Sequence, residues 1–236
     1  MNISEIISDA LVYPFQNIKA LIIYMILGII AGIVAGGTIV AMAAGLAANN
    51  ALAAAGTGII GLIIALIIAF VISGYGLDVI KYGINRDAGS PGLDFVRQFV
   101  NGVKLLVVNI VYFIVPIIIG AILAVIFQHW LSGLITAILF IIFALAAVMG
   151  QCRLAKTEEL GNALAIGEAI GDISRVGILK LIVFIIVVFI IAFILSFIVM
   201  AINNWNATVG GILMGILSVY ITFFVARATG LLYSNV

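Results

Sequence analysis

Long apolar stretches alternate with short polar segments along the whole chain. The apolar stretches cover residues 20–46, 53–76, 105–127, 131–152, 178–202 and 209–230. Each contains about the 20 residues that a helix needs to cross roughly 30 Å of hydrocarbon. The pattern therefore predicts an all-α, polytopic membrane helix bundle with six transmembrane helices, formed by a single integral membrane domain over residues 1–236.

A short amphipathic segment precedes every second apolar stretch. In the central segment, apolar residues such as Phe99 recur at helical spacing, while Arg97 and Gln98 are polar. Similar patterns occupy residues 2–18 and 164–175. We therefore predict three hairpins, each preceded by a short amphipathic helix on the membrane surface. The order repeats, in pattern more than in residue identity, over approximately residues 1–82, 90–156 and 163–236.

Composition supports a membrane location and excludes several kinds of site. The chain is 66% hydrophobic and 8% charged, whereas a soluble domain is about half apolar and about a quarter charged. A net charge of +1 provides no strongly basic face, so no nucleic-acid partner is expected. The only cysteine is Cys152 and the only histidine is His129. A cysteine cluster or multi-histidine metal site within the chain is thus excluded, and no cofactor is predicted.

Positive charge is distributed unevenly between the two ends of the predicted hairpins. All ten Lys and Arg residues lie in the N-terminal segment, in the two long polar loops with their amphipathic segments, or at the helix ends beside them. Because positive residues mark the cytoplasmic side, we predict a cell-membrane protein with both chain ends in the cytoplasm. Four basic residues are assigned to the membrane boundary, Arg227 by snorkelling of its long side chain. They are Lys19, Lys104, Lys180 and Arg227.

Small residues at four-residue intervals mark helix faces that can pack closely. They are Gly28, Gly32 and Gly36 in the first apolar stretch, and Gly61, Ala65 and Ala69 in the second. Such spacing places small residues on one face and lets two helix backbones approach each other in lipid. We predict that the two faces pack together within the first hairpin. The alternative is a homodimer formed through the first set.

Few polar groups lie inside the apolar stretches. Asn109, Tyr112 and Pro116 occupy the third stretch, where the proline is expected to kink the helix. The two polar side chains form either a hydrogen bond between packed helices or part of an intramembrane substrate site. No ionisable residue lies at mid-depth of a predicted stretch, which argues against transport coupled through charged side chains. No set of nucleophile and base is visible, so enzyme activity is not expected.

Two residues in the short segments that join the helices of a hairpin belong to types that can form a functional site. His129 stands beside a tryptophan and is interpreted as an interfacial polar residue rather than as a metal ligand or catalytic base. Asn206 begins a glycosylation sequon. We expect this sequon to be unused, because it lies almost at the membrane surface.

Three motifs connect the chain with a known family. They are Gly74-Tyr75-Gly76-Leu77, Phe99-Val100-Asn101-Gly102-Val103-Lys104, and Tyr112 with Pro116. With them the chain resembles an uncharacterised archaeal and bacterial family of multi-pass membrane proteins, domain of unknown function 4013. More distantly, the plan is similar to the membrane domain attached to some glycerophosphodiesterases. The resemblance implies a membrane location and a helical architecture, but no reaction.

Two functions are compatible with this sequence. The first is a non-enzymatic scaffold or partner subunit, which contacts membrane lipids and docks a membrane protein or a second copy of the chain. The alternative is a transporter or lipid-handling protein for an apolar or amphipathic substrate. A cavity lined by Asn109 and Tyr112 would favour the alternative. A solid bundle with a tightly packed first hairpin would favour the scaffold.

Overall fold

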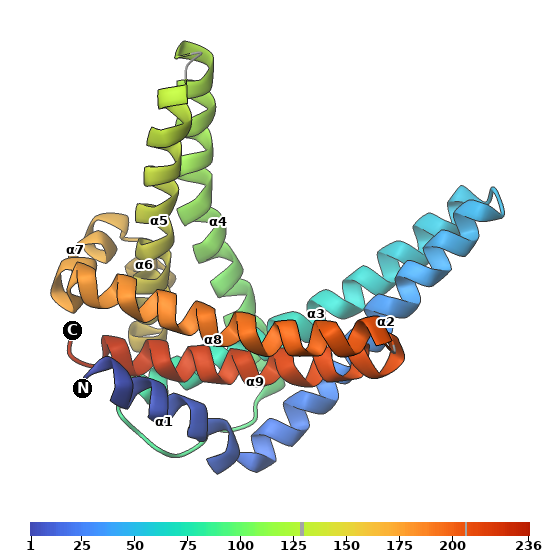
Figure 1. The fold of residues 1–236 in the computed structure, drawn as a ribbon, viewed down its shortest axis with the longest axis horizontal. Coiled ribbons are helices and arrows are strands. Elements are labelled where there is room, and N and C mark those ends of the chain that lie inside the picture. Colours follow the sequence, from blue (N-terminus) through green and yellow to red (C-terminus); the bar gives the residue numbers. More distant parts are fainter. Residues whose placement is uncertain (128–129, 206) are drawn as a thin grey trace.

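The computed structural model describes residues 1–127, 130–205 and 207–236, and all regular structure in these ranges is helical (Figure 1). Six of the described helices are long and apolar enough to cross a membrane. They are α2 (Ile18–Ala47), α3 (Ala51–Ile84), α4 (Phe95–Ile126), α5 (Trp130–Thr157), α8 (Ile178–Trp205) and α9 (Ala207–Tyr233). The shorter helices are α1 (Ile3–Gln16), α6 (Leu160–Ala163) and α7 (Ile166–Val176). The predicted all-helical, multi-pass membrane protein is confirmed.

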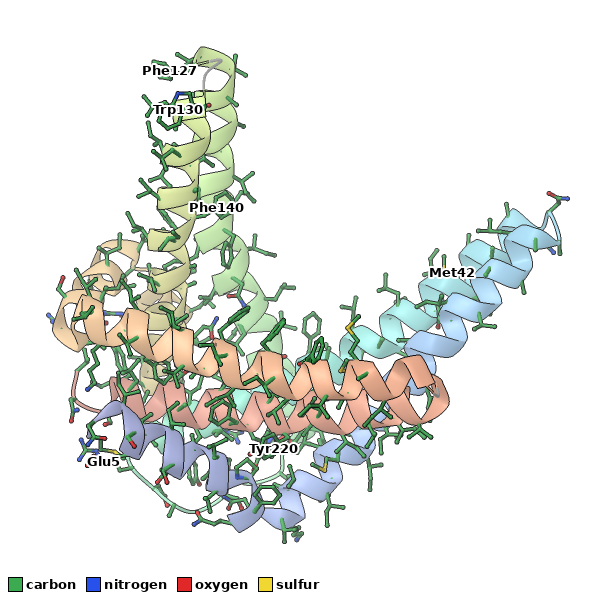
Figure 2. All side chains as sticks on the ribbon, viewed as in Figure 1. Glu5, Met42, Phe127, Trp130, Phe140 and Tyr220 are labelled. Atoms are coloured by element: carbon green, nitrogen blue, oxygen red, sulfur yellow. The ribbon has the colours of Figure 1, made fainter. Side chains whose placement is uncertain are left out.

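Consecutive long helices lie side by side: α2 with α3, α4 with α5, and α8 with α9 (Figure 1). The pairs diverge from a common region, so that their tips lie apart. α3, α5 and α9 contact one another in this region, near their C-terminal ends. We call it, together with α1, α7 and residues 85–94, the charged end. Apolar side chains cover the outer parts of the pairs, up to Phe127 and Trp130 at one tip (Figure 2).

Two of the three amphipathic segments form separate helices. α1 contains Pro14 and ends at Gln16. α7 ends at Val176 and is followed by Gly177, whose φ of 96° suits a residue without a Cβ. The central segment differs, because α4 runs without interruption from Phe95 to Ile126. The prediction of a separate surface helix is therefore wrong for the central segment, which forms the first turns of α4. No breaker follows Asp94, whose side chain caps the helix by accepting a hydrogen bond from the Arg97 amide at 3.0 Å.

Helices α3 and α4 cross in direct backbone contact. A Cβ placed on Gly74 would lie 1.7 Å from the backbone oxygen of Gln98, and one placed on Gly102 would lie 2.1 Å from that of Phe70. Only glycine permits so close an approach. The crossing brings the first turns of α4 alongside the C-terminal half of α3, and this contact determines the polar structure described next.

Candidate functional site

A buried polar network joins α3 to the first turns of α4. Asp78 in α3 is only 5% exposed. It accepts hydrogen bonds from Arg97 Nη2 at 2.9 Å, from Arg97 Nη1 at 3.2 Å and from Asn101 Nδ2 at 3.2 Å. Gln98 is fully buried, and its side-chain oxygen accepts a hydrogen bond from the hydroxyl of Tyr24. Charged and amide groups therefore pack inside the protein at the charged end.

In this network, the polar side of the central amphipathic segment faces the protein interior, whereas a helix on the membrane surface would turn that side towards water. Its polar residues face α3, whereas Val96 is 78% exposed and Val100 also faces outward. A helix lying between water and lipid would expose its polar side to water. Here the polar side is satisfied within the protein. The sequence did not identify Asp78 as a site residue, because Asp78 was assigned to the segment where the second span leaves the membrane. The opposite charges of Asp78 and Arg97 were the signal that could have predicted their ion pair.

Arg227 is a buried link rather than a snorkelling residue. It is 2% exposed, and its Nε donates to Asp9 Oδ1 at 2.7 Å. Its Nη1 donates to the backbone oxygen of Asp87 at 2.5 Å, and its guanidinium carbon lies 4.6 Å from the centre of the Tyr13 ring. Burial raises the pKa of the Tyr13 hydroxyl, so it stays neutral. The snorkelling interpretation is wrong, because the side chain holds α1 and the loop after α3 onto α9.

A second buried carboxylate belongs to α7. Asp172 is 0% exposed and accepts hydrogen bonds from Tyr233 at 2.6 Å, Arg153 Nη1 at 2.9 Å and Arg175 Nη1 at 3.0 Å. Arg153 also pairs with Glu168. The polar side of the third amphipathic segment was expected to be solvated. Instead it joins α7 to α5 and α9, because two arginines and a tyrosine satisfy the buried charge.

The predicted boundary lysines lie at the surface of the charged end. Lys104 Nζ donates to the backbone oxygen of Glu158 at 3.0 Å, and Lys180 Nζ donates to that of Met1 at 3.2 Å. Lys19 is exposed. Lys81 pairs with the side chain of Glu158, and its hydrogen bond and charge hold the pKa of that carboxyl below its usual range. Their position relative to a membrane stays a prediction.

A cavity of about 440 Å³ lies where α3, α4, α5 and α9 meet. Most of its wall is apolar. Its polar residues are Ser73, Asn109, Gln151, Thr222 and Thr229. Gln151 Nε2 donates to Asn109 Oδ1 at 3.0 Å, so two carboxamides stand together on its wall. No residue described as lining this cavity carries a formal charge.

The structure separates Asn109 from Tyr112. Asn109 lines the cavity, but Tyr112 is fully buried elsewhere. The hydroxyl of Tyr112 donates to the backbone oxygen of Ala163 at 2.8 Å, and its ring occupies the space that a Cβ on Gly150 would need. Pro116 is buried within the continuous helix α4. Of the three candidate residues in this stretch, Asn109 lines the cavity. Its hydrogen-bond partner Gln151 was not predicted, because Gln151 was assigned to the end of a span.

The small residues of α2 and α3 do not form the single packing interface that was predicted within the first hairpin. A Cβ on Gly28 would lie 2.6 Å from the backbone oxygen of Gly215 in α9, and a Cβ on Gly36 would meet no atom within 4 Å. A Cβ on Gly61 would lie 1.7 Å from Thr38 Oγ1, so this residue does pack on α2. Gly28 approaches α9 because Gly215 also lacks a side chain. The residues that remain line a second cavity, of about 560 Å³, between α2, α3 and α9; they are Gly32, Ala65 and Ala69.

Comparison with known proteins identifies the family. A family model described as protein of unknown function (DUF4013) matches residues 61–204, which is more than half of the chain. The chain belongs to the DUF4013 family. In this DUF4013 protein, the match includes Asp78, Arg97 and both cavity carboxamides, whereas α1, α2 and α9 lie outside it.

The other comparisons add no relative to the DUF4013 assignment. No curated protein and no solved structure matches the chain. The likeness to the membrane domain of some glycerophosphodiesterases therefore stays a prediction. His129 and Asn206 lie outside the described residues of this DUF4013 protein, so their interpretations also stay predictions.

Proposed function

We propose that this DUF4013 protein is a lipid-handling membrane protein that binds an amphipathic molecule in the cavity of Asn109 and Gln151. The cavity itself carries the proposal. Its volume of about 440 Å³ falls in the range of about 300–1,000 Å³ typical of small-molecule sites. Its wall is apolar apart from a few amide and hydroxyl groups that converge there. Such a lining favours a ligand that is mainly hydrocarbon with one polar head.

The lining also selects the kind of head. Burying a charge without a partner is costly, and the residues described as lining this cavity supply no countercharge. A carboxamide has both donor and acceptor groups. Because Asn109 Oδ1 accepts from Gln151 Nε2, this bond does not use the amide hydrogens of Asn109 or the carbonyl of Gln151, and a ligand head could bond to them. An uncharged head with hydroxyl, ester or amide groups suits this pair.

The first test is to replace the carboxamides. In the variant N109L/Q151L, affinity for the lipid that copurifies in native nanodiscs, and with it the occupancy, should fall by up to about 30-fold, since two hydrogen bonds of about 1 kcal/mol each are lost. Native mass spectrometry measures this occupancy. Gln16→Leu, which replaces an exposed amide in α1, is the matched control and should retain it. Unchanged occupancy in the double variant would contradict the proposal.

The ion pairs support a threefold architecture. Each amphipathic segment is held by the returning helix of a different pair: α1 by α9, the start of α4 by α3, and α7 by α5. The ion pairs are Asp9–Arg227, Arg97–Asp78 and Asp172–Arg153. This cyclic order is the one expected if the segments around residues 1–82, 90–156 and 163–236 are repeats of one hairpin unit. We propose that these three hairpins cross the cell membrane with the charged end in the cytoplasm, as the positions of Lys and Arg favour.

Thiol labelling tests this orientation. Asn49→Cys at the α2–α3 tip should react with a membrane-impermeant maleimide in intact cells, whereas Asp87→Cys at the charged end should react only after permeabilisation. The unsubstituted protein is the control, because its Cys152 is buried. Labelling of Asp87→Cys in intact cells would reverse the proposed topology.

A partner subunit is the second candidate, and one feature of α8 favours it. Phe189, Phe193 and Phe197 form an exposed stripe, with ring centres 6.1 and 6.2 Å apart. Aromatic residues are enriched in protein interfaces. This candidate predicts that a partner protein copurifies stoichiometrically. The variant F193A should lose that partner protein and retain the lipid.

A further inference from the structure

We infer that the hydrocarbon tail of the bound lipid runs from the polar cavity into the second cavity, so that both form one elongated site. This inference rests on the proposed function and specifies its substrate: a lipid with an uncharged head and an acyl chain. The second cavity, of about 560 Å³, lies between α2, α3 and α9. It shares two lining residues with the polar cavity, Ser73 and Thr222. The two cavities are therefore adjacent, and a lipid tail that extends from one into the other would pass these two residues.

The hydroxyl groups on the α9 wall of the second cavity are already satisfied. Thr222 Oγ1 donates to the backbone oxygen of Ser218 at 2.8 Å, and Ser218 Oγ donates to that of Gly215 at 2.8 Å. Bonds of this kind, to the preceding turn of the same helix, satisfy the polar hydrogens without a ligand. The second cavity therefore lacks the amide pair that would hold a polar head, and its chemistry suits hydrocarbon.

Small side chains give the second cavity its shape. On the α2 wall it is lined by Gly28, Ala31, Gly32 and Ala35. At 1.5 Å per residue, these positions follow α2 for about 10 Å. Ala65 and Ala69 face them from α3. A channel that follows a helix in this way fits a linear acyl chain lying along α2.

The test narrows the second cavity with a larger side chain on α2 and compares the binding of two lipids that differ in acyl-chain length. Lipid-free protein in detergent is titrated with two monoacylglycerols, one with a short and one with a long acyl chain. Gly32→Leu should weaken binding of the long-chain probe about tenfold, the affinity that roughly two buried methylene groups contribute. Binding of the short-chain probe should not change. Gly36→Leu, one turn further along α2 and with no atom within 4 Å of an added Cβ, should bind both probes normally.

The outcomes separate this inference from the proposed function. Unchanged long-chain binding in Gly32→Leu would overturn the tail assignment, while the head site stands if N109L/Q151L weakens both probes. If neither probe binds the unsubstituted protein, the proposed function fails and the tail assignment fails with it. Ala69→Leu fills the channel from the opposite wall, and it replaces Gly32→Leu should that variant not fold. Continued protection of Cys152 from thiol reagents shows that a variant is folded.

Discussion

Gly74→Ala should lower the midpoint of thermal unfolding by about 4–8 °C, which corresponds to a net cost of about 2 kcal/mol at about 2–4 °C per kcal/mol for a chain of this size. The added Cβ would lie 1.7 Å from the backbone oxygen of Gln98. A backbone atom cannot rotate away, so α3 and α4 must separate. Overpacking of this kind costs about 1–3 kcal/mol and occasionally more. The higher helix propensity of alanine offsets up to about 1 kcal/mol, so the clash determines the sign.

The single cysteine provides the measurement. Cys152 is fully buried between α5 and α9, so a dye that fluoresces on reaction with a thiol reports unfolding in detergent. Gly36→Ala is the control with the same chemical change, because an added Cβ meets no atom within 4 Å there. It should leave the midpoint unchanged or slightly raised. Equal midpoints for the two variants would show that the backbones of α3 and α4 are not in contact at Gly74.

The long helices could be predicted because their cause is local. A stretch of about 20 apolar residues must satisfy its backbone hydrogen bonds within itself in lipid, and only a helix does so in a single segment. The bounds of α1 and α7 also lie close to the amphipathic segments predicted at residues 2–18 and 164–175, although α1 continues past Pro14 to Gln16. These features depend on neighbouring residues alone.

The orientation of helix faces could not be predicted in the same way. The pattern of residues 95–104 shows that one side of the helix is polar, but not whether water or another helix satisfies it. The answer depends on Gly74 and Gly102, which bring α3 against that side. Likewise, Gly28 was predicted to pack against the second apolar stretch, but it approaches Gly215 in α9, which lies far along the chain. The candidate site shows the same difference. Asn109 could be identified from the sequence, but its hydrogen bond with Gln151 could not, because that bond depends on α4 and α5 lying side by side.

The two interpretations of Arg227 predict different results for Asp9→Asn. If Arg227 extended into water at the membrane boundary, the loss of a nearby carboxylate would change stability by about 1 kcal/mol or less. In the structure its side chain is buried against Tyr13, and Asp9 is its anionic partner. Removing one partner of a fully buried pair costs about 3–5 kcal/mol, because the other charge stays buried and uncompensated. The Asp9 side chain is 38% exposed, so the cost should lie at the lower end of this range. We therefore expect the unfolding midpoint to fall by roughly 10 °C.

A double variant separates the buried charge from the loss of a contact. In D9N/R227M no charge remains in the buried position, so this variant should be more stable than Asp9→Asn alone, although it lacks the same ion pair. The reactivity of Cys152 is a suitable measurement, because its sulfur lies 4.0 Å from the backbone oxygen of Thr229, two residues from Arg227. Asp87→Asn removes an exposed carboxylate from the same end of the protein. It should change the free energy of unfolding by no more than about 0.5 kcal/mol. A double variant as unstable as Asp9→Asn would show that the contact, and not the uncompensated charge of Arg227, holds α1 to α9.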